Sequence, residues 1–501
     1  MKAFVKKLMI CFYRILNVIL PKSSRMIVFS TSNGKAAGGN PRAIYEYAVH
    51  DIAQKGLKMK LVWFLTDELM AKHPEEAAKL LSTAENAGTY DLTSNDAPGN
   101  KEKHFNIKEM SVGIKRSNAR IGRTGSTCRI VRYHHPLYYW YMARAGAWIF
   151  DSRQEPYIAK RSGVRYLQTW HGTPLKKLGL DIDELNMAGE NIDTATYQEA
   201  FKREAAQWDY LIAQNDFSAE TFRRCFDFKG KMLKIGYPRN DVLVRAARGK
   251  TGVIVNNEKI DETGETDQTD KINKIDKNEK INRTDENDKI EKKYKIDRTD
   301  KIDKNKKRIT LLYAPTWRDD KYLEGGWYAY SSPLDFKKLY KLMGGDYRIV
   351  IKPHYLVKMR NGDIPADMIN NGFVTICGHS EEINDLYLAA DGLITDYSSV
   401  MFDYSLLGRP MFFYAYDMEE YANVLRGFYF DLKTEAPGPI CRTVEELALT
   451  IRDTFEEKGF NGQYRIKAEK FAEKYNMYDR GDAARKAWEE IVKNMIGGSN
   501  V

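Results

Sequence analysis

The sequence predicts an α/β protein built from two open, mostly parallel sheets that face each other across a cleft. Short apolar runs rich in β-branched residues alternate with longer polar or helical segments, which is the pattern of parallel strands with crossover connections. This pattern occurs twice, on either side of a low-complexity segment. With 501 residues and a hydrophobic content of 43%, the chain can bury two substantial cores.

The strands are expected at the apolar runs themselves. The first half contributes residues 26–30, 60–65, 147–150, 165–169, 210–213 and 233–235, and the second half contributes residues 309–313, 348–351, 373–376, 392–395 and 411–414. We expect residues 24–250 to form the first domain and residues 308–495 to form the second. A final helical region, at about residues 462–495, is predicted to pack back across the domains.

The segment between the two halves, residues 256–307, is built mainly from Lys, Ile, Asp, Asn, Thr and Glu. Its Lys-Ile units recur at multiples of three residues. A spacing of six turns the isoleucines by about 120° around a helix at each step, so no continuous apolar stripe forms. Acidic and basic residues nearly balance. We therefore predict a solvated, mostly disordered insert or a fluctuating charged helix, and not a tail that binds nucleic acid.

The first 22 residues predict an amphipathic helix. Lys6, Lys7, Arg14 and Asn17 interrupt the apolar run, which therefore falls short of the roughly 20 apolar residues that a spanning helix needs. No small-residue cleavage site follows, which disfavours a signal peptide. A basic, apolar-rich helix of this kind suits the surface of an anionic membrane, where we predict peripheral attachment. The alternative is a helix that docks on the protein itself.

Two histidine motifs each follow a predicted strand. They are Trp170-His171-Gly172-Thr173-Pro174 and Lys352-Pro353-His354. Both imidazoles are therefore expected at the carboxyl ends of strands, where open α/β sheets form their ligand crevices. Gly172 leaves backbone room for a ligand, and Thr173 and Pro174 can open a helix as its N-cap and first-turn residues. A satisfied core histidine is the alternative for either motif.

Two adjacent serines, Ser398 and Ser399, stand between a predicted strand and an apolar-periodic helix. Free N–H groups, two hydroxyls and the positive end of a helix dipole suit a phosphate or diphosphate. An ordinary N-cap would explain one serine but gives no reason for the flanking Asp396 and Asp403. Arg239 follows another strand-like run, and its guanidinium is well shaped for phosphate oxygens.

Charge and cysteine content narrow the class further. Lys and Arg number 79 against 69 Asp and Glu, a net charge of +10, which favours anionic donors, anionic polymers or acidic lipid surfaces. Nucleic acid is not predicted as a partner, because no zinc-knuckle, RNP or helix-turn-helix pattern occurs. Five scattered cysteines without a CxxC pair predict free thiols on the cytoplasmic side. No DxD-type pair stands in a metal-like loop, so neither a metal ion nor another cofactor is predicted.

Together these motifs resemble the CDP-glycerol glycerophosphotransferases of teichoic-acid and capsule synthesis. The resemblance rests on residues 168–176, 237–241, 313–318, 352–354 and 394–403, and it continues into residues 426–431 and 437–439. It covers roughly residues 24–250 and 308–495. It implies a GT-B-like fold of two Rossmann-like domains, with the acceptor on the first and the CDP-linked donor on the second.

The implied reaction transfers glycerol phosphate, or a related polyol phosphate, from a CDP-alcohol such as CDP-glycerol. The acceptor is a hydroxyl of a lipid-linked saccharide or a polyol-phosphate chain, and CMP is released at the cytoplasmic face of the membrane. Whether the donor carries glycerol or ribitol stays open. Once the insert is set aside, little sequence remains for a further acceptor-binding domain, which favours a priming or short-chain transferase over a processive polymerase.

The resemblance also implies roles for individual residues. His171 is the candidate general base, and His354 with Lys352 would stabilise the charge of the diphosphate. Ser398 and Ser399 would hold the diphosphate, and Asp403 would address the ribose or the helix cap. The full set of expected donor-binding residues is Gly172, Thr173, Pro174, Leu175, Arg239, Thr316, Trp317, Lys352, Ser398, Ser399 and Asp403.

Two other functions fit parts of the pattern. A GT-B glycosyltransferase would use the same diphosphate cleft with a nucleotide sugar, and turnover of CDP-alcohols against UDP-sugars separates the two. A non-enzymatic membrane scaffold would use only the basic helix and the charged insert. On that hypothesis the histidine and serine motifs would be idle, and no CDP-alcohol would bind.

Overall fold

The computed structural model describes most of both predicted domains. It covers residues 2–87, 117–183, 193–251, 308–316, 322–323, 327–329, 332–353, 357–359, 362–378, 381–418, 427–457, 460, 462–493 and 495. The predicted insert at residues 256–307 lies outside the described residues, as do His354 and Trp317.

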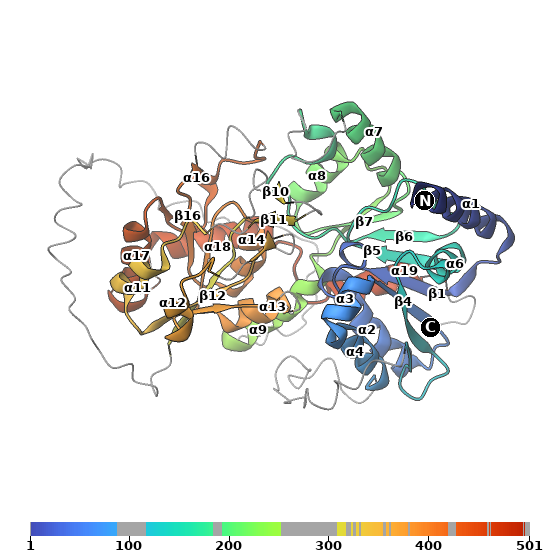
Figure 1. The fold of residues 1–501 in the computed structure, drawn as a ribbon, viewed down its shortest axis with the longest axis horizontal. Coiled ribbons are helices and arrows are strands. Elements are labelled where there is room, and N and C mark those ends of the chain that lie inside the picture. The colour runs from blue at the N-terminus through green and yellow to red at the C-terminus, as the bar shows by residue number, and fades with distance from the viewer. Residues whose placement is uncertain are drawn as a thin grey trace, which may run out of the picture.

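Two parallel sheets form the framework (Figure 1). The first has the order β3-β4-β2-β1-β5-β6-β7-β8, and in it β3 alone is antiparallel to its neighbour. Its strands are β1 (Ser23–Ser30), β2 (Lys60–Leu65), β3 (Asn118–Arg120), β4 (Thr127–Arg132), β5 (Ala145–Phe150), β6 (Arg165–Gln168), β7 (Tyr210–Ala213) and β8 (Lys231–Lys234).

The second sheet has the order β14-β12-β9-β15-β16-β17 and is parallel throughout. Its strands are β9 (Ile309–Tyr313), β12 (Tyr347–Ile351), β14 (Val374–Ile376), β15 (Gly392–Thr395), β16 (Met411–Tyr414) and β17 (Ile440–Cys441). A small third sheet joins β10 (Tyr322–Leu323), β11 (Trp327–Ala329) and β13 (Val357–Lys358).

Helices cover both faces of the first sheet, because its strands are apolar on both sides. One face packs against α2 (Gly39–Lys55), α4 (Pro74–Glu85) and α19 (Ala483–Val492). The other packs against α1 (Lys2–Ile19), α6 (Pro136–Arg144), α7 (Thr194–Ala205) and α8 (Asp216–Cys225). The short helix α3 (Asp67–Lys72) follows β2.

The second sheet is covered in the same way. One core lies under α11 (Phe336–Met343), α12 (Ala366–Asn370) and α17 (Val444–Arg452). The other lies under α9 (Asp241–Thr251), α13 (Ile383–Ala389), α14 (Val400–Tyr404), α16 (Leu432–Glu435) and α18 (Gln463–Tyr475). Two Rossmann-like domains therefore stand side by side, and the predicted GT-B-like fold is confirmed.

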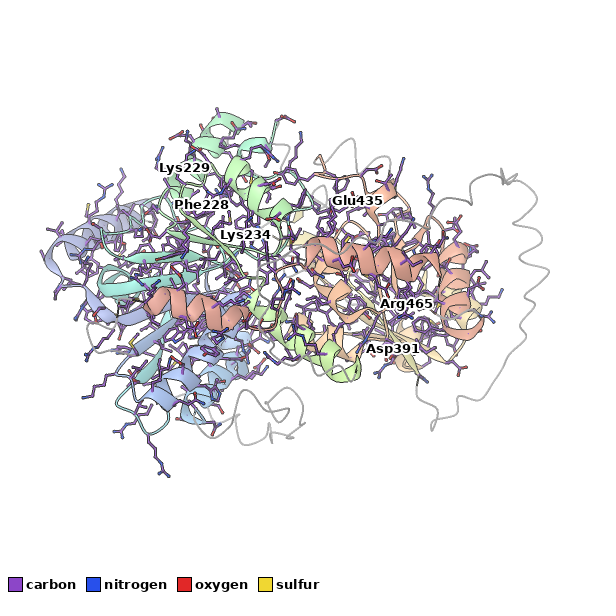
Figure 2. The ribbon with its side chains drawn as sticks, turned by 180° about the vertical axis from the view of Figure 1, so that it is seen from behind. Phe228, Lys229, Lys234, Asp391, Glu435 and Arg465 are labelled. Atoms are coloured by element: carbon purple, nitrogen blue, oxygen red, sulfur yellow. The ribbon has the colours of Figure 1, made fainter. Side chains whose placement is uncertain are left out.

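Two helices cross from one domain to the other. Leu243 of α9 follows the first domain in sequence but lies in a core of the second. Trp488 of α19, at the end of the chain, lies in a core of the first domain, where its Nε1 donates to Asp51 at 2.8 Å. Figure 2 shows α18 on the second domain and α19 on the first. The segment 308–495 therefore does not belong to the second domain alone.

Candidate active site

The loop after β6 carries His171 and is held in a strained conformation. Trp170 adopts a left-handed backbone with φ of 51°, which is costly for a bulky residue. Its N–H donates to Gln168 Oε1 at 3.0 Å, and its carbonyl accepts from Asn40 Nδ2 at 3.0 Å. Its indole stacks on the His171 ring at 4.6 Å between centroids. The fold therefore fixes both the backbone and the plane of His171.

The tautomer of His171 follows from its neighbour. Nδ1 of His171 lies 3.2 Å from the main-chain oxygen of Asp151, and a carbonyl can only accept, so Nδ1 carries the proton. Nε2 then has a free lone pair. Burial lowers the pKa of His171, an effect that the Asp151 carboxylate opposes and Arg239 reinforces. The residue is nevertheless exposed to solvent.

Asp151 was not predicted from the sequence. It directly follows the buried strand β5, and its carboxylate accepts from the main-chain N–H of Ser32 and from Ser152 Oγ, both at 2.8 Å. Burial raises the pKa of Asp151, and the charge of His171 opposes that rise. Asp151 thus provides a backbone acceptor and a nearby carboxylate for the same imidazole. A carboxylate at the end of a buried strand is the signal that could have found it.

Arg239 and Asp403 join the two domains beside His171. Arg239 Nη2 donates to Asp403 Oδ2 at 2.6 Å, and Nη1 donates to the main-chain oxygen of His171 at 2.9 Å. Asn240 Nδ2 donates to the other Asp403 oxygen at 2.8 Å. Both carboxylate oxygens are therefore engaged by the first domain, and Asp403 does not act as the helix cap. Its ribose contact stays a prediction.

Further contacts close the junction around Arg239. Asn40 Oδ1 accepts from the Arg239 N–H at 3.2 Å, and Asn384 Nδ2 of the second domain donates to the Arg239 carbonyl. Gly38 lies close to the Glu382 carboxylate, which would have to shift to admit a side chain at residue 38. The glycine-rich segment after β1, residues 33–41, thus reaches the domain junction, and Asn384 was not predicted.

The serine pair lies opposite the His171 loop. A Cβ atom on Gly172 would come within 3.3 Å of Ser399 Oγ, so a larger residue there would crowd the serine. Ser399 stands at the N-cap of α14 without making a side-chain capping bond, and Ser398 Oγ accepts only a long 3.5 Å contact from the Val400 N–H. The ordinary N-cap interpretation is therefore wrong for Ser399, although the helix it precedes is short.

No helix opens at Thr173 and Pro174, so that prediction is wrong. Thr173 is buried, and its Oγ1 donates to Gln214 Oε1 at 2.6 Å. The following segment is extended, since the carbonyl of Leu175 accepts from the Tyr429 N–H of the second domain at 3.0 Å. The Leu175 side chain also lies in a core of the second domain. Tertiary pairing with the other domain therefore overrides the local helix signal. Donor contacts by these residues stay predictions.

Thr316 and Lys352 follow strands β9 and β12 of the second domain. The Thr316 N–H donates to Asp396 Oδ1 at 2.8 Å, which ties the end of β9 to the end of β15. Lys352 Nζ donates to the main-chain oxygen of Gly378 at 2.8 Å, and burial lowers the pKa of Lys352. Among the described residues, no three His, Cys, Asp or Glu side chains gather as metal ligands do.

The arrangement is that of a two-domain α/β protein with a histidine held beside the contact between its domains. The family model described as "CDP-Glycerol:Poly(glycerophosphate) glycerophosphotransferase" matches residues 100–265 and 277–493, and the chain belongs to this family. The predictions of family, enzyme class and fold are therefore confirmed.

Named relatives agree with this assignment. A teichoic acid poly(glycerol phosphate) polymerase of Bacillus spizizenii is 30% identical over 95% of this chain and 93% of its own length. A teichoic acid glycerol-phosphate transferase of Staphylococcus aureus is 35% identical over 71% of this chain and 78% of its own length. The teichoic acid poly(glycerol phosphate) polymerase of Bacillus subtilis is 32% identical over 86% of this chain. The match spans only 44% of the length of that polymerase.

Solved structures of the wall teichoic acid polymerase TagF share the architecture. One superposes with a TM-score of 0.66 at 27% identity, over 99% of this chain and 95% of the TagF chain in that structure. A polymerase relative that aligns over 93% of its own length has no large additional domain. Chain length therefore does not distinguish priming from polymerisation, and the expectation of a priming enzyme stays a prediction.

Proposed function

We propose that this protein transfers glycerol phosphate from CDP-glycerol to a hydroxyl of a lipid-linked saccharide or a polyol-phosphate chain, with release of CMP. The observation that carries the proposal is the imidazole of His171, which is fixed through Nδ1 and whose neighbour Gly172 lies close to Ser399 of the second domain. The family relationship supports the CDP-linked donor, as does a TagF structure soaked with CDPG.

In the proposed reaction the acceptor hydroxyl attacks the phosphorus that bears glycerol. A new bond forms between the acceptor oxygen and that phosphorus, and the bond from phosphorus to the bridging oxygen of the diphosphate breaks. CMP leaves with the bond's electron pair. The acceptor proton passes to Nε2 of His171, whose Nδ1–H keeps donating to the Asp151 carbonyl oxygen. The Asp151 carboxylate offsets the positive charge that the imidazole gains.

The donor is proposed to lie against the second domain. The hydroxyls of Ser398 and Ser399 would donate to diphosphate oxygens, in line with the absence of a capping bond at Ser399. Arg239 supports this side indirectly, because it fixes both the His171 carbonyl and Asp403. His354, Lys352, Thr316 and Trp317 keep their predicted donor roles as part of the proposal.

A turnover screen tests the function. The purified protein is incubated with a lipid-linked acceptor and with CDP-glycerol, CDP-ribitol or UDP-sugars, and released nucleotides are separated by chromatography. CMP release that depends on acceptor and CDP-glycerol supports the proposal. UDP release from a UDP-sugar would support the glycosyltransferase instead. Failure to bind any CDP-alcohol would support the scaffold.

We further propose attachment to the cytoplasmic face of the membrane through α1. None of the described helices is long and apolar enough to cross a bilayer. Tyr13 and Leu16 of α1 are buried against the protein, as the docking alternative expects. The same helix also displays large apolar side chains to solvent, namely Leu8, Phe12, Ile15, Val18 and Ile19. Such a helix can dock on its own domain and still insert a side into the interface.

A further inference from the structure

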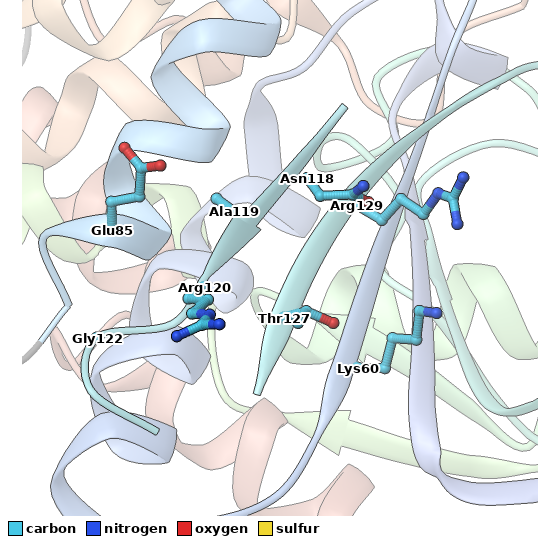
Figure 3. Close-up of a pocket in the computed structure, with 8 residues that line it drawn as sticks. All are labelled: Lys60, Glu85, Asn118, Ala119, Arg120, Gly122, Thr127 and Arg129. Carbon is cyan, nitrogen blue, oxygen red and sulfur yellow. The ribbon is translucent and has the colours of Figure 1, made fainter. Parts of the chain in front are cut away.

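An open, basic basin lies at the edge of the first sheet (Figure 3). It has a volume of about 720 Å³ and is formed by the neighbouring strands β3, β4 and β2 together with the end of α4. Figure 3 shows its cationic side chains on three adjacent strands, and the principal lining residues are Lys60, Arg120, Arg129, Asn118, Thr127 and Glu85.

The basin is remote from the active site. Lys60 and Thr127 are the first residues of the parallel strands β2 and β4, whereas His171 follows the last residue of β6. In a parallel sheet, all strands have their carboxyl ends along one side of the sheet and their amino ends along the opposite side. The basin and the catalytic cleft therefore lie at opposite ends of the first sheet.

The cations of the basin lack acidic partners. Lys60, Arg120 and Arg129 form no ion pair within the described ranges. Nε of Arg129 is buried without a hydrogen-bond partner there. Glu85 is the single acidic residue among those that line the basin. Three cations without a described acidic partner in one concave surface attract anions.

The basin shares a face of the sheet with α6. Side chains alternate along a strand, so Lys60 points to the same side as Val62, and Arg129 to the same side as Val131. Val62 and Val131 belong to the core that α6 covers. Tyr141 of α6 makes the link, because Lys60 Nζ lies 5.1 Å from its ring and Arg129 Nη1 donates to its hydroxyl at 3.1 Å.

Helix α1 packs on the side of α6 away from the basin. Tyr13 of α1 packs against Tyr139 of α6 with ring centroids 6.0 Å apart, whereas Tyr141 of the same helix faces the basin. Trp140 lies between them in sequence and carries the Arg144 guanidinium over its ring at 4.7 Å. An apolar helix, an aromatic residue and a cationic basin on one side of a domain match the layers of a membrane interface.

We propose that this basin binds the phosphodiester headgroups of anionic phospholipids while α1 inserts its apolar side into the same leaflet. The inference rests on the proposed membrane attachment. A single helix leaves the protein free to rotate about the helix axis, and a second contact on the far side of α6 removes that freedom. The alternative occupant, a polyol-phosphate chain, is disfavoured because the basin lies at the end of the sheet remote from His171.

Vesicle co-sedimentation tests this site. Vesicles of phosphatidylcholine alone are compared with vesicles that also contain phosphatidylglycerol, using full-length wild-type protein and the variant Lys60→Gln/Arg120→Gln. Arg129 is left unchanged because it packs on Tyr141. Each removed charge should weaken binding to the anionic vesicles about fivefold, the equivalent of roughly 1 kcal/mol, and both together about 25-fold. Binding to phosphatidylcholine should change less than about twofold, and added salt should abolish the difference.

The control removes two exposed lysines from the other domain. Lys467 and Lys470 lie on α18, so Lys467→Gln/Lys470→Gln should bind anionic vesicles like the wild type. Equal losses in both double variants, or unchanged binding of the basin variant, would overturn the proposal. So would normal vesicle binding together with weakened binding of lipid-free poly(glycerol phosphate). CMP release with a detergent-solubilised acceptor is measured in parallel, and it tests the proposed reaction separately.

Discussion

The His171 loop and the segment with Ser398 and Ser399, which meet at Gly172, are held in different ways. In the first domain, Trp170 and Asp151 fix the backbone, ring plane and tautomer of His171. In the second domain, the hydroxyls of Ser398 and Ser399 donate to no protein acceptor within the described residues. The difference suggests a division of labour. The fold holds the His171 ring in one position, whereas the serine hydroxyls remain available to a ligand.

The largest expected effect is at the preorganised loop. His171→Ala should lower turnover by about 10² to 10⁴ while CDP-glycerol affinity falls far less, because the base acts only in the transition state. In the wild type, kcat/KM should fall in acid as His171 gains its proton. The pKa of His171 is lowered, so that fall should come below the pH at which an ordinary histidine titrates.

His73→Ala is the matched control for this prediction, because His73 is a partly exposed histidine between α3 and α4, and it should leave kcat unchanged. Steady-state kinetics over a range of pH checks both variants. A His171→Ala enzyme with wild-type turnover would remove His171 from the role of base.

The ion pair between Arg239 and Asp403, which joins the two domains, should stabilise the fold. Asp403→Ala leaves the Arg239 guanidinium without its carboxylate in a site where only 14% of the arginine side chain is exposed. Breaking one partner of such a buried pair costs about 3 to 5 kcal/mol in the free energy of unfolding. Denaturant unfolding measures it. The exposed pair Lys337–Asp367 is the control, and Asp367→Ala should cost about 0 to 1 kcal/mol. A similar loss of stability in both variants would show that the Arg239–Asp403 pair stabilises the protein no more than an exposed pair does.

The serine pair should affect donor binding more than stability. Replacing Ser398 and Ser399 by Ala should weaken CDP-glycerol binding by about 1.5 to 3 kcal/mol for each charge-assisted bond lost, and CMP binding by less. The free energy of unfolding should change by less than about 0.5 kcal/mol, because Ser399 makes no capping bond.

Thr443→Ala gives the reverse pattern as a control, since Thr443 accepts from the Glu446 N–H at 3.2 Å and is a true cap. It should cost about 1 kcal/mol of stability and leave donor affinity unchanged. Calorimetric titration and thermal unfolding measure both quantities. Equal losses for CDP-glycerol and CMP in the serine variant would place the serines away from the distal phosphate.

The smallest effect is expected at Asp151, which acts on turnover only through His171. Asp151→Asn keeps the carbonyl that accepts from His171 but removes the carboxylate charge. That charge raises the pKa of His171, so its loss should lower this pKa and move the acid limb of kcat/KM to lower pH. Turnover should fall about tenfold. The change should vanish in a His171→Ala background. An unmoved acid limb would reduce Asp151 to a purely structural residue.

The sequence predicted most strands, because strands buried on both faces appear as continuous apolar runs. It did not predict β4, in which Arg129 and Arg132 interrupt the apolar residues near the sheet edge. It also predicted a helix at Thr173 and Pro174 that does not form. There the carbonyl of Leu175 pairs with Tyr429, 254 positions along the chain, and no local pattern carries that information.

The sequence by itself determined the fold class, the family and the motifs that carry the chemistry, because these depend on hydrophobic periodicity and on short runs of residues. Only the tertiary structure decided which side chains meet. Asp151 reaches His171 from the next strand, and Arg239 reaches Asp403 from 164 positions away. Such pairings follow from how two sheets pack and which helices cross between them. They are set by the burial of whole faces, which no single segment of sequence encodes.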